Sequence, residues 1–305
     1  MKRKNSKIKL RYGENPNQEG YLINHHKSSV FDYQISGKKI SYNNLIDLDS
    51  GIRCLKEFSE PTSIILKHTN PCGVASAKNI DIAYNKSYES DPKSAFGGII
   101  LLNRKLSAKL AKKIYKNFYE MIVALDYDHD ALRILEKKKN LILLKMPKII
   151  QSFQECRSTL FGDLHQTRDL SLINNRFLNL VSNKRGSTKS INDLIFSLKV
   201  AKHLKSNAIV LSRNKQTLGL GHGQTNRVDA LNFAIKNMNK YFKKGSFVCA
   251  SDGFFPFTDS INLLNRKGCN VVAQPSGSIN DKKIISFSNK NKISLYFTKN
   301  RLFKH

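Results

Sequence analysis

Short apolar runs alternate with segments of helical periodicity along most of the 305-residue chain. Apolar runs of this length, bounded by turn residues, are typical of buried strands. The pattern predicts strands at 62–68, 97–103, 121–127, 141–146, 207–212, 217–221, 246–251 and 270–274. The strand at 62–68 breaks at once into Asn70, Pro71 and Gly73, which predicts a loop there.

Helical patterns fill several of the intervals between these strands. The segment 227–238 places its apolar residues at helical spacing: Val228, Leu231, Phe233, Ala234 and Met238. Further helices are predicted at 105–119, 258–268 and 279–289, the second of them ending on a C-cap glycine.

The repeated order of strand, loop and helix indicates a layered α/β fold. The stretch 182–190 is polar, carries Gly and Ser, and has no apolar periodicity. It therefore predicts a boundary between two α/β subdomains of similar size, 1–185 and 186–305.

Polar residues gather at the ends of the predicted strands. Lys67, His68, Asn207 and the loops at 221–227, 251–259 and 274–278 are all predicted at or just after the carboxyl end of a strand, where open α/β sheets bind ligands. Taken alone, the Lys67–His68 pair is more typical of a solvated strand end, and the glycine-rich loop at 221–227 is more typical of a tight strand-to-helix turn.

The net charge of +29 leaves three interpretations open. It fits nucleic acid or small anionic ligands, but also a compositional bias, because the lysines are spread from end to end. The dense basic stretches, at the N-terminus, 136–140 and 241–245, do not interleave aromatic residues as a single-strand binding groove does.

The five cysteines are scattered and nowhere spaced C-x-x-C, which argues against a disulfide framework and against zinc. The N-terminus is basic but lacks the apolar segment of a signal peptide, and no run is long enough to cross a membrane. A cytoplasmic protein that binds no metal and no membrane is expected.

Ten segments, in this order, resemble one family. They are LRYGENPNQ, SYNNLIDLD, LKHTNPCGVA, SAFGGII, QTRD, SNAIVL, GLGHGQTNRVDA, SDGFFPFTDSI, QPSGSINDK and NRLF. Together they resemble the transformylase domain of the bifunctional purine-biosynthesis protein that combines AICAR transformylase with IMP cyclohydrolase, AICAR being aminoimidazole carboxamide ribonucleotide.

The resemblance implies two cytidine-deaminase-like α/β subdomains, a homodimer, and formyl transfer from 10-formyltetrahydrofolate to the 5-amino group of AICAR. It makes His68 the proton acceptor and Lys67 the transition-state stabiliser, with Asn207 beside them. The positions that match the AICAR site are Arg11, Tyr12, Asn44, Gly97, Glu120, Phe254 and Arg301; those around the folate are Arg227, Val228, Asp259, Ser278 and Ile279. The resemblance also allows a monovalent cation, potassium, near Ser206 and Asp252. No zinc is expected.

The chain departs from the family pattern in several places. Asn17 stands where the family usually has His, Leu125 where it has Pro, and Gly253 where it has Ala. Because only nine residues precede the first motif, no IMP cyclohydrolase activity is expected, and a separate cyclohydrolase would complete IMP. The alternatives are a weak or inactive nucleotide-binding relative, a fragment of a split bifunctional protein and a nucleic-acid binder.

Overall fold

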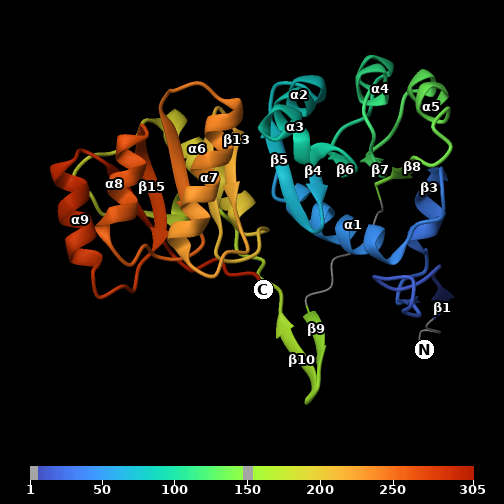
Figure 1. Cartoon of the computed structure of the whole chain (residues 1–305), viewed down its shortest axis with the longest axis horizontal. Coiled ribbons are helices and arrows are strands. Elements are labelled where there is room, and N and C mark those ends of the chain that lie inside the picture. The colour runs from blue at the N-terminus through green and yellow to red at the C-terminus, as the bar shows by residue number, and fades with distance from the viewer. Residues whose placement is uncertain (1–5, 147–153) are drawn as a thin grey trace.

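The computed structural model describes residues 6–146 and 154–305, and the basic N-terminal residues 1–5 lie outside it. Within the described ranges one mixed sheet of twelve strands runs through the whole molecule (Figure 1). No helix in these ranges is long and apolar enough to cross a membrane.

The first half of the sheet comes from residues 34–145. Its strands are β3 (Gln34–Ser36), β4 (Thr62–Lys67), β5 (Asn70–Ser76), β6 (Ile99–Leu102), β7 (Met121–Ala124) and β8 (Ile142–Lys145). Its helices are the short 3-10 helix η1 (Val30–Tyr33), α1 (Tyr42–Leu55), α2 (Ile80–Ser90), α3 (Pro92–Ala95), α4 (Ala108–Tyr115) and α5 (His129–Leu135).

The second half comes from residues 175–298. Its strands are β11 (Leu178–Leu180), β12 (Ile209–Arg213), β13 (Gln216–Gly221), β14 (Phe247–Ser251), β15 (Cys269–Pro275) and β16 (Ser294–Thr298). Its helices are the 3-10 helix η2 (Asn175–Phe177), α6 (Thr188–Ala201), α7 (Arg227–Tyr241), α8 (Thr258–Arg266) and α9 (Asp281–Lys290).

The two halves repeat one another outward from the middle of the sheet. The strand order is β11-β16-β15-β14-β12-β13-β5-β4-β6-β7-β8-β3, so the series β13-β12-β14-β15-β16 mirrors β5-β4-β6-β7-β8. In both series a central antiparallel hairpin is followed by parallel strands. The halves meet where β5 and β13 pair antiparallel, at Ala75 and Gln216.

The helices cover both faces of this sheet. One core unites α1 and α6 against the same face, through residues such as Leu48 and Phe196. On the opposite face, α2, α4 and α5 cover the first half, and α7, α8 and α9 cover the second. The expected layered α/β fold is therefore confirmed, and α1 and α6 join the two halves.

The strands predicted from the apolar runs are all present, but β5 was misread as a loop. Pro71 lacks an N–H group and is unfavourable within a sheet unless the ladder is irregular. The structure provides that irregularity, because the register shifts between Ile65 and Leu66, opposite Pro71. Gly73 is also required, because a Cβ there would lie 1.9 Å from the carbonyl oxygen of Ser87 in α2.

The helix α7 follows its predicted spacing only in part. Leu231, Ala234 and Met238 are buried, whereas Val228 and Phe233 are exposed. The apolar stripe of this helix is therefore narrower than the pattern suggested, which leaves two apolar side chains for other contacts.

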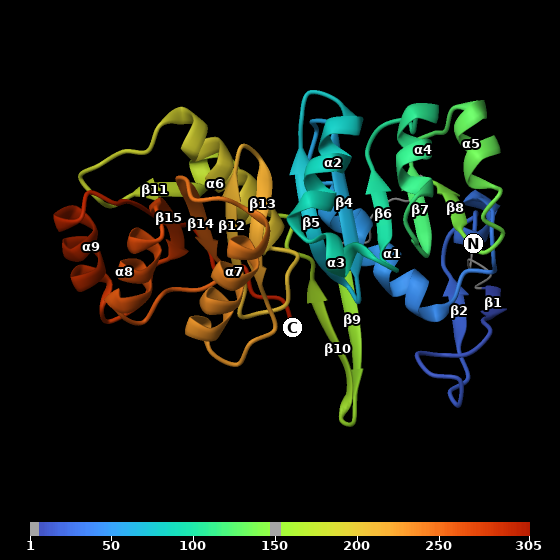
Figure 2. The same cartoon turned by 45° about the horizontal axis from the view of Figure 1, so that its top comes forward.

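Two hairpins stand apart from the large sheet. One pairs β1 (Ser6–Lys9) with β2 (Tyr21–Asn24). The other pairs β9 (Gln154–Thr159) with β10 (Gly162–Thr167) and projects away from the body of the molecule (Figure 2).

Candidate active site

The candidate site begins at the tight turn between β4 and β5. His68 and Thr69 form its two-residue loop and have φ values of 52° and 65°. Such loops favour Asn-Gly, because side chains other than those of Gly and Asn are strained at positive φ. Backbone strain of this kind is retained where surrounding contacts enforce it, and it clusters at functional sites.

Helix α1 supplies those contacts. Asp47 Oδ1 accepts a 2.7 Å hydrogen bond from the Thr69 backbone N–H, and Ser50 Oγ donates to the Thr69 carbonyl at 2.8 Å. Burial raises the pKa of Asp47, although backbone donors and the nearby His68 oppose the shift. The partly buried carboxyl group of Asp47 therefore holds the turn that carries His68.

Lys67, the last residue of β4, directs its charge toward the same end of the sheet. Its Nζ donates to the Phe96 carbonyl at 2.9 Å. Gly97 follows with φ of 75°, and a Cβ there would lie 3.7 Å from Lys67 Nζ. None of the ion pairs found among the described residues includes Lys67. Its charge is therefore not neutralised by a neighbouring carboxylate.

A hollow of about 330 Å³ lies beside Lys67 and His68 and is walled by both halves. The second half contributes His222, Gln224 and Phe233, so one of the exposed apolar residues of α7 lines this hollow. Burial, assisted by the charge of Lys205, lowers the pKa of His222. This imidazole is neutral near pH 7; its loop, 221–227, was expected at the site from the sequence, but His222 itself was not named.

Asn207 belongs to a buried polar cluster at the same edge. Its Oδ1 accepts from Arg227 Nη2 at 2.7 Å, and its Nδ2 donates to the Gln224 carbonyl at 2.9 Å. Arg227 also donates to Ser251 Oγ at 2.9 Å and forms an ion pair with the fully buried Asp252. The amide of Asn207 is therefore fixed in one orientation by the guanidinium.

Asn70 connects this cluster to the turn. Its Nδ2 donates to the His68 carbonyl at 2.9 Å, and its Oδ1 accepts from the Lys205 backbone N–H at 3.4 Å. Lys205 leads directly into Ser206, which the C-terminal segment holds through two hydrogen bonds with the backbone of Lys304. The turn and the Asn207 loop are thus linked through one side chain.

The sequence was compared with known proteins. A family model described as AICARFT/IMPCHase bienzyme matches residues 1–237. Relatives called "Bifunctional purine biosynthesis protein PurH" are 46% identical over 305 residues in Caldicellulosiruptor saccharolyticus, 45% over 305 in Buchnera aphidicola subsp. Baizongia pistaciae and 40% over 307 in Lactobacillus acidophilus. The chain belongs to the AICARFT/IMPCHase family.

The matches cover 97%, 97% and 98% of this chain but only 59%, 58% and 60% of those relatives. The chain therefore spans about three fifths of the length of the bifunctional proteins that it resembles. The remaining candidate site residues are positions that match this family.

The structure places the residues expected to contact AICAR in separate surroundings. Gly97 lies beside Lys67, and the guanidinium of Arg11 lies 5.4 Å from the ring centre of Tyr12. Asn44 is buried and its Oδ1 accepts from Ser41 in the N-terminal cap of α1.

Three further positions from the AICAR set are at least partly accessible. Glu120 pairs with Lys38, Phe254 is 41% exposed, and Arg301 lies over the ring of Phe303 at 4.9 Å. No hydrogen bond or ion pair found among the described residues joins these three to Lys67 or His68.

The residues expected around the folate divide into two groups. Val228, Asp259, Ser278 and Ile279 are exposed or partly exposed and follow β13, β14 and β15. Arg227 is different, because its guanidinium turns inward to Asn207 and Asp252, with its side chain only 9% exposed.

The expectation that Asn207 lies at or just after the carboxyl end of a strand is wrong, because Asn207 precedes β12. Gly97 and Glu120, for which no such expectation was stated, likewise precede β6 and β7. They still lie at the edge of Lys67, because β12 runs antiparallel to β14 and β6 antiparallel to β4. The site edge thus combines carboxyl ends of some strands with amino ends of others.

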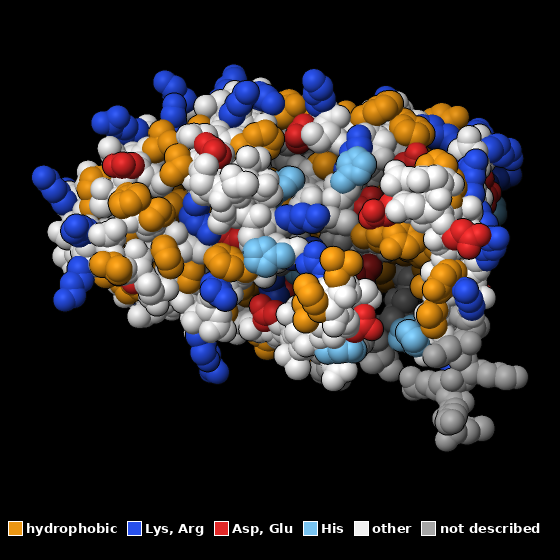
Figure 3. All heavy atoms as spheres, turned by 60° about the horizontal axis from the view of Figure 1, so that its bottom comes forward, with side chains coloured by type: hydrophobic (Ala, Val, Ile, Leu, Met, Phe, Trp, Pro, Cys, Tyr) orange, Lys and Arg blue, Asp and Glu red, His pale blue; other side chains and the backbone are white. Residues whose placement is uncertain are grey.

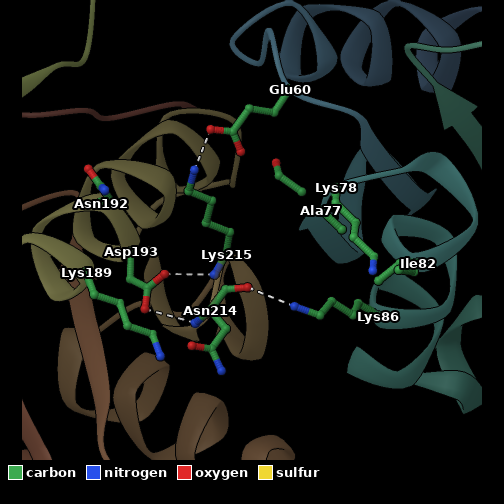
Figure 4. Close-up of a pocket in the computed structure, with 11 residues that line it drawn as sticks. Glu60, Ala77, Lys78, Ile82, Lys86, Lys189, Asn192, Asp193, Asn214 and Lys215 are labelled. Atoms are coloured by element: carbon green, nitrogen blue, oxygen red, sulfur yellow. Dashed lines mark hydrogen bonds and ion pairs between the residues drawn. The ribbon is translucent and has the colours of Figure 1, made fainter.

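A larger hollow, of about 650 Å³, lies at the opposite end of the junction between the halves. Figure 4 shows Lys86 bonded to the Asn214 carbonyl, Lys215 paired with Glu60, and Asp193 bonded to backbone N–H groups. No His or Cys lines it. This hollow is lined by lysines, but unlike the hollow at the Lys67 end it has no imidazole in its lining.

Proposed function

We propose that the chain transfers a formyl group from 10-formyltetrahydrofolate to the 5-amino group of AICAR. The observation that carries this proposal is the strained turn that sets Lys67 and His68 at the rim of a hollow shared by both halves. Family membership supplies the reaction class, and the residues present suit it.

The reaction needs a base and a cation. The amine of AICAR is conjugated with a carboxamide and is weakly nucleophilic, so its proton must leave as the nitrogen attacks the formyl carbon. The C–N bond to the new acceptor forms, the bond to folate N10 breaks, and N10 takes up a proton. An unpaired ammonium stabilises the oxyanion that develops on the formyl oxygen.

His68 is suited to the role of the base. Its side chain is exposed at the turn, and no hydrogen bond to its imidazole is found among the described residues, so the ring is accessible to substrate. Lys67, beside it, is the stabilising cation. Asn207 is the third member of the set, and Arg227 holds its amide for contact with substrate.

The remaining assignments are proposals for binding. Arg11 is exposed and suits a phosphate, and Tyr12 lies beside it. Asn44, Gly97, Glu120, Phe254 and Arg301 complete the AICAR set; Arg227, Val228, Asp259, Ser278 and Ile279 form the folate set. For Asn44 and Arg227, whose side chains already have protein partners, the proposal requires a second contact or a rearrangement on binding.

The fold detail and the assembly also remain proposals. The repeated strand order supports two cytidine-deaminase-like subdomains, divided near residue 185. A homodimer is supported by apolar side chains left in solvent, above all Leu160 and Phe161 at the tip of the β9–β10 hairpin. The cytoplasmic location and a separate cyclohydrolase stay predictions.

A potassium ion near Ser206 and Asp252 receives less support. Asp252 Oδ1 pairs with Arg227, and Asp252 Oδ2 accepts from Ser206 Oγ at 2.6 Å. Because a guanidinium already neutralises this carboxylate, the residues present do not suit a second cation, and no step is assigned to one.

One assay tests the proposed reaction. Purified protein mixed with AICAR and 10-formyltetrahydrofolate should release tetrahydrofolate, followed by absorbance, and chromatography should show the formylated ribonucleotide. Absence of release, with AICAR binding retained, would favour the inactive nucleotide-binding relative.

A nucleic-acid binder would instead show an affinity that falls steeply with salt. Figure 3 shows Lys and Arg side chains scattered over one face, both at its margin and in its middle, rather than gathered into one stripe. On this face the distribution does not single out a nucleic-acid groove.

A further inference from the structure

The β9–β10 hairpin brings together three side chains that the reaction does not use. Cys156 and His165 are directly opposite one another in the hairpin register, and Asp163 lies two residues before His165 on the same face. Cys156 Sγ lies 3.8 Å from His165 Nε2, and one potential ligand atom from each of the three lies within 4.8 Å of the others. Within the described residues this is the only such group.

We propose that this face of the hairpin binds a divalent zinc-type cation through Cys156, Asp163 and His165, with solvent as the fourth ligand. Thiolate, imidazole and carboxylate are the ligands that Zn²⁺ uses, and three protein ligands plus water form an open tetrahedral site. Neighbouring ligand atoms around tetrahedral zinc lie roughly 3.5 Å apart, given the usual bond lengths. The thiol and imidazole are already close to that spacing, and the carboxylate needs to approach by about an ångström.

The opposite face of the hairpin explains why these side chains are available. Glu155, on that face, accepts from Gln166 at 3.1 Å and pairs with Arg53 of α1 and with Arg168. Because side chains alternate across a strand, anchoring Glu155 to the body turns Cys156 and His165 the other way.

Among the paired residues of the two hairpin strands, the proposed metal face carries no positive charge. Its other paired residues are Gln154, Ser158 and Thr167, so neither strand places a Lys or Arg there in a chain with a net charge of +29. Ser158 Oγ donates to Asp163 Oδ1 at 2.7 Å and orients the carboxylate, as outer partners of metal ligands commonly do.

Sequence spacing could not show this site. The search for C-x-x-C tests ligands that are close in the chain, whereas here a hairpin turn brings ligands together across two strands. The expectation of a chain without any metal site is therefore replaced, for this hairpin, by the proposal of a cation bound outside the active site.

Cobalt(II) is the probe that tests the proposal. Added to the metal-free full chain, it should bind with a stoichiometry of about one and produce thiolate-to-cobalt charge-transfer absorption, which Zn²⁺ then abolishes by displacement. Binding should release the thiol proton to the buffer. Among the five cysteines only Cys156 is exposed, so zinc should also slow its alkylation.

Four variants make the test specific. Cys156→Ser should remove the charge-transfer band, and Asp163→Asn and His165→Gln should each raise the dissociation constant by roughly tenfold or more. The matched control is His129→Gln, which changes an exposed histidine beside Asp130 and should leave binding unchanged. Circular dichroism and thermal melting would confirm that each variant is folded.

The proposal is overturned if the band persists in Cys156→Ser. It is also overturned if Asp163→Asn and His165→Gln bind cobalt as tightly as the parent chain, which would mean a thiol acting alone. Binding that saturates only at millimolar metal, and equally in His129→Gln and His165→Gln, would show non-specific surface binding and reject the site.

Discussion

Two tight turns lie at opposite ends of the junction between the halves, and they have the same backbone but different side chains. The β4–β5 turn contains His68 and Thr69, and the β12–β13 turn contains Asn214 and Lys215, all four with φ between 51° and 65°. A carboxyl group from a supporting helix holds each of these hairpin turns. Asp47 of α1 serves the first, and Asp193 of α6 serves the second through bonds of 2.9 and 2.7 Å to both backbone N–H groups.

The difference lies in what the side chains meet. Both turns line a hollow, but Lys67, beside the first turn, is in none of the ion pairs found in the described ranges. At the second, Lys215 pairs with Glu60, and Lys86 donates to the carbonyl of Asn214 at 3.0 Å. The same scaffold thus supports an accessible imidazole and ammonium at one end and a bonded joint between the halves at the other, so the two turns differ in their side chains rather than in their backbone.

The largest expected effect is loss of turnover at the first turn only. His68→Ala and Lys67→Ala should each lower kcat by about a hundredfold to ten-thousandfold, the usual contribution of a general base, with little change in AICAR binding. Asn214→Ala at the second turn is the matched control and should retain kcat within about twofold. Steady-state kinetics would check all three. Near-parental turnover in either His68→Ala or Lys67→Ala would remove that residue from the mechanism.

Much of the difference between the two ends of the junction could not be predicted from the sequence. The apolar runs predicted β4, β12 and their neighbours, because buried strands need continuous apolar residues. Lys67, His68 and Asn207 were selected through their motifs. The inward turn of Arg227 was not predictable, because it depends on an ion pair with Asp252, which lies beyond the end of α7 and just after β14.

The structural repeat of the two halves also could not be recognised from the sequence of their turns. Asp47 and Asp193 occupy equivalent places, yet the turns that they hold read as His-Thr and Asn-Lys. A shared backbone conformation was specified by tertiary hydrogen bonds rather than by turn residues. Local propensity, which favours Asn-Gly here, therefore could not reveal it.

The supporting carboxyl groups should affect stability at both turns but activity at one. Asp47→Ala and Asp193→Ala each remove the acceptor from backbone donors that are strained and partly buried, so each should lower the free energy of unfolding by about 1–3 kcal/mol. Only Asp47→Ala should also lower kcat, because Asp47 holds the turn that carries His68. Urea unfolding followed by kinetics at matched folded fraction would check this. Equal loss of kcat in both variants would mean that the two ends are not functionally distinct.

The joint between α1 and α6 should make stability depend on pH. His203, just beyond α6, lies 3.1 Å from Glu57, just beyond α1. Burial lowers the pKa of His203, although Glu57 opposes the shift. Burial alone would raise the pKa of Glu57, but His203 and Lys202 outweigh it and lower the pKa.

Both pKa shifts make the folded protein less stable as the pH falls. Below the unfolded histidine pKa of about 6.5 the unfolded chain binds a proton that the folded chain resists, so stability falls as pH drops from there toward 5. The Glu57 contribution is lost at still lower pH, as its carboxylate protonates. His203→Gln keeps a hydrogen-bond donor. In urea titrations, the free energy of unfolding of this variant should change less between pH 7 and pH 5 than that of the parent chain. An unchanged slope would assign the acid sensitivity to other groups.

The smallest expected effect is at the second turn, where Lys215 pairs with Glu60 across the junction. Both side chains are partly exposed, at 33% and 50%, so solvent screens the pair and a coupling energy of about 0.2–1 kcal/mol is expected. A double-mutant cycle with Lys215→Met and Glu60→Gln, measured by urea unfolding at low and high salt, would give that value and show it shrinking with salt. Turnover should stay unchanged in the whole cycle, because this end of the junction holds the halves together without contacting substrate. A change of kcat as large as that in Lys67→Ala would show that the joint transmits strain to the His68 turn, and the contrast between the two ends would then fail.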